Sequence, residues 1–432
     1  MTTISRWALA PVGVWLTVAN AKRLTSQAIS SLLRSRHQPN VQSANRPTPP
    51  FTSEPDQMGF KPSHRTIART AFAFLLSFAL TWPMFAHAQT DIVTFDSVPD
   101  NRDSIDADEP IAESFSAKQA AIYLDRASLT WQKEKKCVTC HTNMPYMFAR
   151  PALASVQKDS GEVREFFERY RTERWKTKAP KEAQGFWVIV VAAGLTFNDM
   201  QTTGHLSPIT RDVLDFLWTT QRADGGWDWP DCDYAPMEID DHFGVTLAAL
   251  AVGIAPEGYA DTEAAKAGIA KLRTYFNNNP PKSLHHRAMI AWCSQRIDGL
   301  MTADERQRTV EELLSKQLPD GGWSTAGFLT DWNGLERNDG EPLDTQTSDG
   351  YGTGLVIVIS RELGIPAGDP RLQKGIQWLL ANQRESGKWF TRSPVNDAGN
   401  LISNTGTAYA ILALQSCGEL PGWPFESQTS AP

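Results

Sequence analysis

Gln221-Arg222-Ala223-Asp224-Gly225-Gly226-Trp227 recurs as Gln317-Leu318-Pro319-Asp320-Gly321-Gly322-Trp323 and, less completely, as Gln383-Arg384-Glu385-Ser386-Gly387-Lys388-Trp389. A heptapeptide that returns along a chain indicates one structural unit used several times. Each copy ends a helix-like stretch and precedes a second, apolar one. The three pairs of stretches are 213–221 with 245–253, 310–317 with 352–363, and 375–383 with 405–415. The repeating unit is therefore predicted to be helix, loop, helix.

The rest of the chain from Ala117 onward carries the same kinds of pattern. Residues 91–113 are acidic, lack helical periodicity, and are predicted to form an extended arm. No part of the sequence alternates regularly between apolar and polar residues, as strands do. The sequence therefore predicts an all-α fold. Further apolar stretches fall at 185–195 and 288–295, and turn-rich connectors fall at 199–207, 277–283 and 331–348.

The first part of the chain has the features of an export signal. A basic stretch at 65–69 precedes an apolar run at 70–80, and Ala86-His87-Ala88 provides small residues for cleavage before Gln89. We expect a periplasmic or otherwise exported protein, with an uncleaved membrane anchor as the alternative. The expected segments are a Pro- and Ser-rich leader (1–57), a signal peptide (58–88), an arm and helical segment with the Cys motif described below (89–160), the repeat domain (161–420) and a tail (421–432). Translation that begins at Met58 would omit the leader.

Composition narrows the class of partner. The chain has 432 residues and a formal net charge of −7, which argues against a nucleic-acid partner. The part that follows the predicted signal is long enough to bury a substantial core. Five cysteines are present, and two of them stand in a recognisable motif described below.

The repeated loops resemble those of the squalene cyclase and prenyltransferase repeat group over roughly residues 183–418. That resemblance implies an alpha-alpha toroid, an α/α barrel of paired inner and outer helices, here with an N-terminal helical extension. It also implies that the loops tie outer helices together, so that Gln221, Trp227, Gln317 and Trp323 are structural. The glycines permit tight turns, and the Gln amide can bond the ends of helices.

An acidic motif, Pro236-Met237-Glu238-Ile239-Asp240-Asp241-His242, directly precedes the apolar stretch at 245–253. A helix N-terminus favours charged carboxylates, whereas burial and mutual repulsion would keep one of them protonated and able to act as an acid. The motif resembles the Asp-x-Asp-Asp motif of squalene-hopene cyclases. The resemblance implies that Asp240 protonates an alkene, with Glu238 and Asp241 setting its environment. The alternative is a helix cap with solvated acids.

Other features qualify this resemblance. Glu238 replaces the first aspartate, and its longer side chain could misplace the acid. His242 is a candidate to hydrogen-bond the acid or to bind a metal. The chain has room for little more than one barrel, so the expected ligand is an apolar isoprenoid or another hydrophobic small molecule, squalene or a smaller one, and peripheral contact with a membrane is expected. A zinc site at Asp231 and Cys232 is a further alternative, although their spacing differs from that of the prenyltransferases.

A second motif, Cys137-Val138-Thr139-Cys140-His141, has the spacing of c-type haem attachment. Cys137 and Cys140 would bind the haem vinyl groups, and His141 would be an axial ligand of the haem iron. Export agrees with haem attachment, but it equally favours a structural or redox disulfide between the two cysteines. The sixth ligand is open, with candidates among Met200, His205, His242, His285 and His286.

Two hypotheses of different classes follow from the two motifs. The first is an exported terpenoid-cyclase-like enzyme of the isomerase or lyase class, with Glu238, Asp240, Asp241 and His242 as site residues. The second is a haem c-bearing redox or sensing protein that uses the toroid as a scaffold. The distance between the two motifs cannot be derived from the sequence.

Overall fold

The structure is a computed structural model, and it describes residues 92–100, 105–175, 185–232, 234–397 and 399–420. All of these belong to the second of the two units into which the chain divides, residues 85–432. The expected leader, signal peptide and tail lie outside the described residues. Across the described ranges the regular structure is helical, apart from the isolated bridges Ile111–Arg384 and Tyr234–Glu238. The all-α prediction is confirmed.

From Phe186 onward, the described helices alternate along the chain between mostly buried and partly exposed. None of them is both long and apolar enough to cross a membrane. They are α2 (Ala117–Lys135), α3 (Asn143–Ala149), α4 (Glu162–Arg169), α5 (Phe186–Thr202), α6 (Pro208–Thr219), α7 (His242–Ile254), α8 (Glu263–Asn278), α9 (Leu284–Cys293), α10 (Ala303–Ser315), α11 (Gly350–Glu362), α12 (Pro370–Ala381) and α13 (Ile402–Ser416). Short turns η1 (Arg150–Leu153), η2 (Tyr170–Arg174), η4 (Tyr259–Asp261) and η5 (Ala326–Phe328) join some of them.

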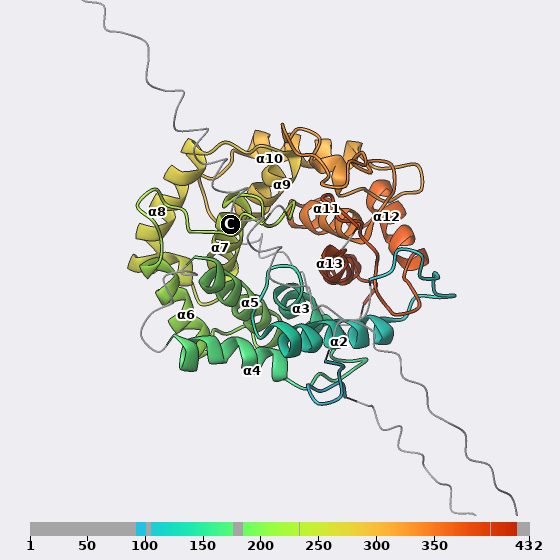
Figure 1. Cartoon of the computed structure of the whole chain (residues 1–432). Coiled ribbons are helices and arrows are strands. Elements are labelled where there is room, and N and C mark those ends of the chain that lie inside the picture. The colour runs from blue at the N-terminus through green and yellow to red at the C-terminus, as the bar shows by residue number, and fades with distance from the viewer. Residues whose placement is uncertain (1–91, 101–104, 176–184, 233, 398, 421–432) are drawn as a thin grey trace, which may run out of the picture. The chain divides into compact units, whose positions relative to one another are not determined.

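Six helices form an inner ring of contacts, which we define as α3, α5, α7, α9, α11 and α13. Each contacts the next in this order, and α13 contacts α3 to complete the circuit. The even-numbered helices lie outside it (Figure 1). The sequence explains the two roles. In α7 every residue except Gly253 is buried, whereas α12 buries only one stripe, formed by Leu372, Gly375, Ile376 and Leu379.

Helix boundaries depart from the sequence prediction mainly at α5. The predicted connector began at Asp199, but the helix continues to Thr202. Asp199 is buried and forms an ion pair with Arg164 at 2.7 Å. It also accepts a hydrogen bond from the Ser207 backbone N–H at 2.7 Å. These partners satisfy a polar side chain that would otherwise favour a turn. Apolar periodicity alone could not reveal them.

The glutamine of each repeated loop joins its own loop to the next outer helix. Gln221 Nε2 donates to the carbonyl oxygens of Gly225 at 3.0 Å and of Gly268, in α8, at 3.1 Å. Gln317 Nε2 does the same with Gly321 at 2.8 Å and with Arg371, in α12, at 2.7 Å. One side chain thus satisfies a turn carbonyl and a carbonyl of the next helix together.

The tryptophans of the loops anchor each loop to the preceding outer helix. Trp227, Trp323 and Trp389 are all fully buried. In each case the indole N–H donates to the carbonyl ten residues earlier, at 2.8 to 3.1 Å. These bonds satisfy the only polar atom of a large buried side chain.

The third loop connects the end of the repeat region to its beginning. Gln383 Nε2 donates to the Ser116 carbonyl at 3.1 Å, and the Ser116 backbone N–H donates to Gln383 Oε1 at 2.7 Å. Lys388, which replaces the second glycine, is buried and pairs with Glu109 of the N-terminal segment. Although this copy has diverged most in sequence, it makes the contacts that attach α2 to α12.

Replacement of Gly387 by alanine should weaken this attachment. Gly387 has a φ of 99°, and an added Cβ would overlap the Gln119 carbonyl of α2. Gly364 is a matched control, because its φ is 89° but an added Cβ would meet only open space. Gly364→Ala is expected to cost about 1–2 kcal/mol through backbone strain, and Gly387→Ala a further roughly 1–3 kcal/mol through overpacking. Urea unfolding of both variants measures the difference, and equal losses would contradict the assigned role of the loop.

Candidate functional site

The segments that precede the inner helices converge at one end of the inner ring, which we call its N-terminal end. Thr405, near the start of α13, donates to the His141 carbonyl at 2.9 Å. Cys140 Sγ donates to Glu238 Oε1 at 2.9 Å. At the start of α9, His285 Nε2 hydrogen-bonds the Tyr351 hydroxyl of α11 at 2.8 Å. The Cys-x-x-Cys-His motif and the acidic motif therefore lie together at this end.

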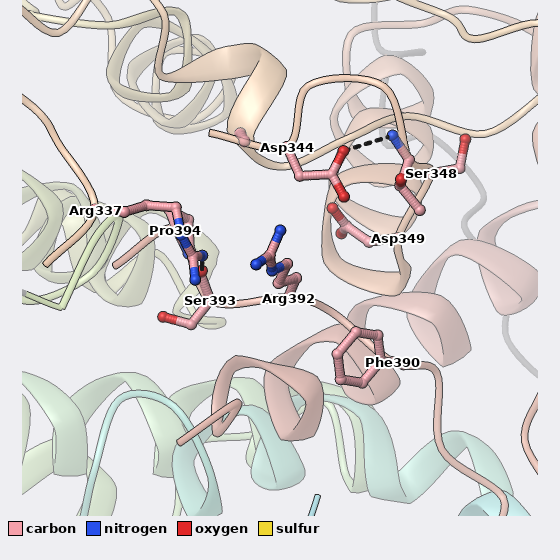
Figure 2. A pocket seen from close by; sticks show the side chains of 10 residues that line it. Arg337, Asp344, Ser348, Asp349, Phe390, Arg392, Ser393 and Pro394 are labelled. Carbon is pink, nitrogen blue, oxygen red and sulfur yellow. Dashed lines mark hydrogen bonds between the residues drawn. The ribbon is translucent and has the colours of Figure 1, made fainter. Parts of the chain in front are cut away.

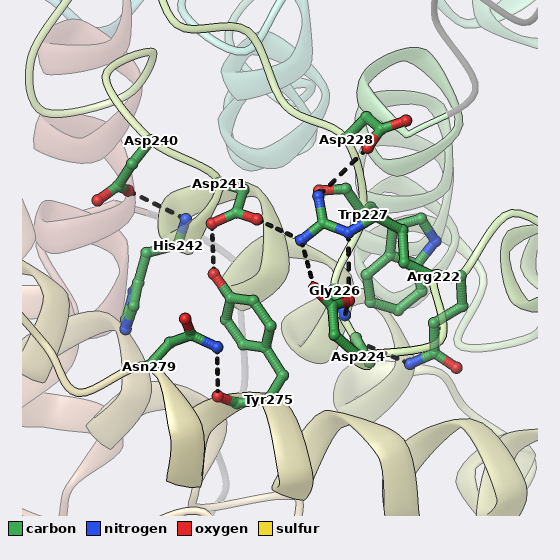
Figure 3. Close-up of polar contacts among 12 residues, drawn as sticks. Arg222, Asp224, Gly226, Trp227, Asp228, Asp240, Asp241, His242, Tyr275 and Asn279 are labelled. Carbon is green, nitrogen blue, oxygen red and sulfur yellow. Dashed lines mark hydrogen bonds and ion pairs between the residues drawn. The ribbon is translucent and has the colours of Figure 1, made fainter. Parts of the chain in front are cut away.

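Asp241, the last carboxylate of the acidic motif, faces the repeated loop. It accepts hydrogen bonds from Arg222 Nη2 and from the Tyr275 hydroxyl, both at 2.5 Å (Figure 3). Arg222 also pairs with Asp224 and Asp228. Burial, followed by the Asp241 carboxylate, raises the pKa of Tyr275. Asp241 therefore links the start of α7 to the first loop and to α8.

Asp240 has different partners. Its carboxylate pairs with Lys282 Nζ at 2.8 Å and accepts the His242 backbone N–H at 3.0 Å. His286 Nε2 lies 3.7 Å from it. The shared environment of three carboxylates that the sequence suggested around Asp240 is not formed in this arrangement, because Lys282 and Arg222 neutralise Asp240 and Asp241 separately.

Glu238 turns toward the cysteine motif. Its carboxyl accepts hydrogen bonds from the side chains of Cys140 and Cys232, and burial raises its pKa against the opposing effect of those two bonds. Of the three acidic side chains of the motif, this is the one that contacts thiols. The glutamate side chain, one methylene longer than an aspartate, reaches Cys140 with its carboxyl.

The two thiols of the motif differ in exposure. Cys140 is fully buried, and burial, followed by the nearby Glu238 carboxylate, raises its pKa well above the ordinary value. Cys137 is half-buried; burial raises its pKa, opposed by the Trp131 N–H and the charges of Arg174 and Lys135. Cys137 is thus the more accessible thiol and Cys140 the protected one.

His141 is packed among aromatic rings. Its Nδ1 shares a hydrogen bond with the Thr142 hydroxyl at 2.8 Å. The ring meets Trp131 edge-on at 4.7 Å between centroids and lies 5.6 Å from the Tyr234 ring. A haem bound by Cys137, Cys140 and His141 would have to displace both rings and break the contact between Cys140 and Glu238. The residues as arranged do not accommodate that group, and haem attachment stays a prediction.

Three buried histidines form a second feature of the N-terminal end. The rings of His242 and His286 are stacked, 4.1 Å apart between centroids and 7° from parallel. Neither ring nitrogen of His242 has a hydrogen-bond partner, and neither do His285 Nδ1 and His286 Nε2. Burial lowers the pKa of His242 to about 4 and of His285 to about 3, and it lowers that of His286 as well. The sequence marked His242 as a partner of the acid or a metal ligand and marked His285 and His286 only as possible haem ligands, although two histidines in an apolar stretch were a signal of buried polar groups.

No metal-binding geometry accompanies these groups. Within the part of the chain that the structure describes, no three His, Cys, Asp or Glu side chains are arranged to hold an ion. The suggested metal roles of His242 and Cys232 therefore stay predictions.

Aromatic side chains from the inner helices fill the middle of the inner ring. Phe197 of α5 lies 6.0 Å from Trp292 of α9, which lies 6.2 Å from Tyr409 of α13, between ring centroids. Tyr409 in turn lies 5.1 Å from Tyr351 of α11. All four are at least 96% buried. The chain of rings crosses from one side of the inner ring to the other.

A small pocket opens beside the start of α11 (Figure 2). Its volume is about 70 Å³, enough for a handful of water molecules at roughly 10–15 Å³ of such volume each. Burial raises the pKa of Asp349, at its wall, to about 6. Thr325 and the Gly352 backbone donate to that carboxylate, which caps α11. The pocket is lined by Ala326, Arg337, Asp344, Thr347, Ser348, Asp349, Phe390, Arg392, Ser393 and Pro394.

The buried histidines should make stability fall in weak acid. His242 has a pKa of about 4 when folded and about 6.5 when unfolded. The unfolded chain therefore binds more protons between these values, and stability is lost as the pH falls through that window. For His242 the loss between pH 7 and pH 5 is about 2 kcal/mol.

His242→Phe should remove that part of the pH dependence. A phenyl ring preserves the stacking and forfeits no hydrogen bond, because neither nitrogen has a partner. Urea unfolding at pH 7 and pH 5 measures the effect, with His205→Gln, at a side chain 77% exposed, as the control. A variant that loses as much stability as the wild type would show that His242 is not the titrating group.

Comparison of the sequence with models of protein families finds no match, and comparison with curated proteins finds none either. The contacts of this site place two sequence motifs at one end of a ring of helices, with a thiol of one motif hydrogen-bonded to a carboxyl of the other.

Proposed function

We propose that this chain is an exported redox protein whose chemistry is thiol–disulfide exchange at Cys137 and Cys140, with Glu238 as the proton acceptor. One observation carries the proposal, the hydrogen bond of 2.9 Å from Cys140 Sγ to Glu238 Oε1. A thiol reacts as its thiolate, so a buried thiol needs a neighbouring base to take its proton. A carboxyl whose pKa is raised is a stronger base than an ordinary one, which suits Glu238 to the task.

The reaction transfers a disulfide from a substrate to the protein. The Cys137 thiolate attacks one sulfur of the substrate disulfide and releases the other as a thiolate, which takes a proton from water. Cys140 then gives its proton to the Glu238 carboxylate and attacks the Cys137 sulfur. The second substrate thiolate leaves and is protonated, so one disulfide is broken and one is formed. The reverse sequence reduces the protein.

The rest of the chain supports this role as a scaffold. We take the inner ring and its outer helices to be an alpha-alpha toroid, as the repeated loops suggest. The exported location proposed from the N-terminal sequence would supply disulfides as substrates. The burial of Cys140 suits a thiol that an incoming disulfide reaches through another thiol of the site and not directly.

Acid chemistry on an apolar isoprenoid is the second candidate, favoured by the aromatic rings that fill the inner ring. Aromatic faces stabilise the cations that alkene protonation would create. Asp240, the acid implied by the resemblance to cyclases, is however paired with Lys282 at 2.8 Å. A ligand of that size would also have to displace the buried rings. These two points place acid chemistry behind thiol exchange.

Glu238→Gln should slow closure of the Cys137–Cys140 disulfide by about 10²-fold, since the amide cannot accept the thiol proton. Oxidised glutathione starts the reaction, acid stops it, and the mass of the tryptic peptide 137–158 reports the disulfide. Asp240→Asn removes the neighbouring carboxylate and should leave the rate unchanged. Equal rates in the wild type and Glu238→Gln would contradict the proton-acceptor role, whereas loss of isoprenoid turnover in Asp240→Asn would favour the second candidate.

The same peptide distinguishes a disulfide from a haem. When the chain is exported by a host that attaches c-type haem, we expect peptide 137–158 to be two hydrogens lighter than the dithiol and to carry no haem. The reason is that haem attachment would require Cys140 to leave Glu238 and the rings around His141 to move. A peptide heavier by one haem, with the visible spectrum of a c-type cytochrome, would overturn the thiol-exchange proposal.

A further inference from the structure

A third thiol approaches the same carboxyl. Cys232 is exposed, whereas Cys140 is fully buried, yet the side chains of both hydrogen-bond Glu238. The other two cysteines are elsewhere. Cys293 donates to the Thr246 carbonyl at 3.2 Å within the core, and Cys417 follows the last residue of α13. One carboxyl therefore lies between a solvent-facing thiol and a protected one.

The backbone holds Cys232 in this position. The N–H groups of Cys232 and Tyr234 both donate to the Glu238 carbonyl, at 2.9 and 3.1 Å, and the Glu238 N–H returns a bond to the Tyr234 carbonyl at 2.8 Å. The chain thus doubles back on itself between Cys232 and Glu238. This turn brings the side chain of Cys232 close to that of Glu238.

The turn is itself fixed to the inner ring. The Tyr234 hydroxyl accepts the N–H of Ile402, the first residue of α13, at 2.8 Å. Trp229 Nε1 donates to the Met237 carbonyl at 2.7 Å. These contacts therefore hold Cys232 close to Glu238, whose carboxyl also accepts the Cys140 thiol.

We infer that Cys232 is a third redox thiol of this site, which forms a disulfide with Cys140 and so passes oxidation between the buried thiol and solvent. The inference rests on the proposed thiol exchange and adds a second route to Cys140, which no disulfide in solution can reach directly. Its partner is a dissolved or protein disulfide that meets Cys232 at the surface.

The exchange balances without any further reagent. The Cys232 thiolate, its proton passed to the Glu238 carboxylate, attacks Cys140 Sγ in the Cys137–Cys140 disulfide. The bond between Cys137 and Cys140 breaks as that between Cys232 and Cys140 forms, and Cys137 leaves as a thiolate that takes the proton. The new bond requires the sulfurs to approach to about 2.05 Å, so the Glu238 side chain moves aside as it forms. The number of disulfides is unchanged.

The test isolates the second route by removing Cys137. Full-length Cys137→Ser is treated with oxidised glutathione, digested with trypsin without reductant, and analysed by mass spectrometry. We expect peptide 137–158, now containing only Cys140, to be linked to peptide 223–266, which contains only Cys232. A second substitution, Cys232→Ser, in the Cys137→Ser variant should abolish the link. The control substitution Cys417→Ser in the same variant should leave the yield of the link unchanged. Cys137→Ala provides the same measurement if the serine variant does not fold.

The outcomes separate this inference from the proposed function. If Cys140 remains a thiol in the oxidised variants while the wild type forms the Cys137–Cys140 disulfide, Cys232 has no redox role and thiol exchange stands. If the wild type forms no Cys137–Cys140 disulfide but the variants form Cys140–Cys232, the third thiol stands and the proposed pair fails. Glutathione attached to Cys232 alone, with Cys140 unreacted, would also overturn the inference.

Discussion

The attachment of α2 to the third repeated loop is the contact on which the remaining structure depends. All fifteen residues of α13 are buried, so this helix needs neighbours on every side. α11 covers one side, and α2 and α3 cover another. The bonds between Gln383 and Ser116 hold α2 where it can do so. Without them the apolar surfaces of α13 and α3 would meet water, and burial of such surface is the main source of stability.

Closing the circuit of inner helices also determines where polar groups can gather. Six buried helices that begin at one end bring their preceding segments together there, although these segments are far apart in sequence. Cys140 and Glu238 are separated by 98 positions and meet because α3 and α7 both flank α5. Phe197, Trp292 and Tyr409 contact one another in series between the inner helices, whereas both sequence motifs lie at the N-terminal end.

The sequence predicted the parts of this structure that local patterns control. Repeated loops and apolar stretches indicated paired helices, because turn glycines and continuous burial leave a local trace. The sequence could not predict the partners of the acidic motif. Lys282 and Tyr275 belong to later segments, and only the fold brings them to Asp240 and Asp241. The degraded third loop looked least important by its residues. Its bonds to Ser116, at the start of α2, help to complete the circuit, and they use the backbone carbonyl and N–H of Ser116, which leave no mark on the sequence.

Charge distribution explains why one carboxyl of three is suited to proton exchange. Asp240 is paired with Lys282 and Asp241 with Arg222, so each of these two carboxylates faces a cation. Glu238 is influenced by burial and by two thiols, and no cation contributes to its pKa among the described residues. Burial makes its charged form unfavourable, so a proton moved from a thiol to this carboxyl restores a neutral group. Burial also raises the pKa of Cys140, which favours its protonated thiol. In the proposed exchange, the raised pKa of Glu238 therefore favours transfer of the thiol proton to the carboxyl, whereas the raised pKa of Cys140 opposes it.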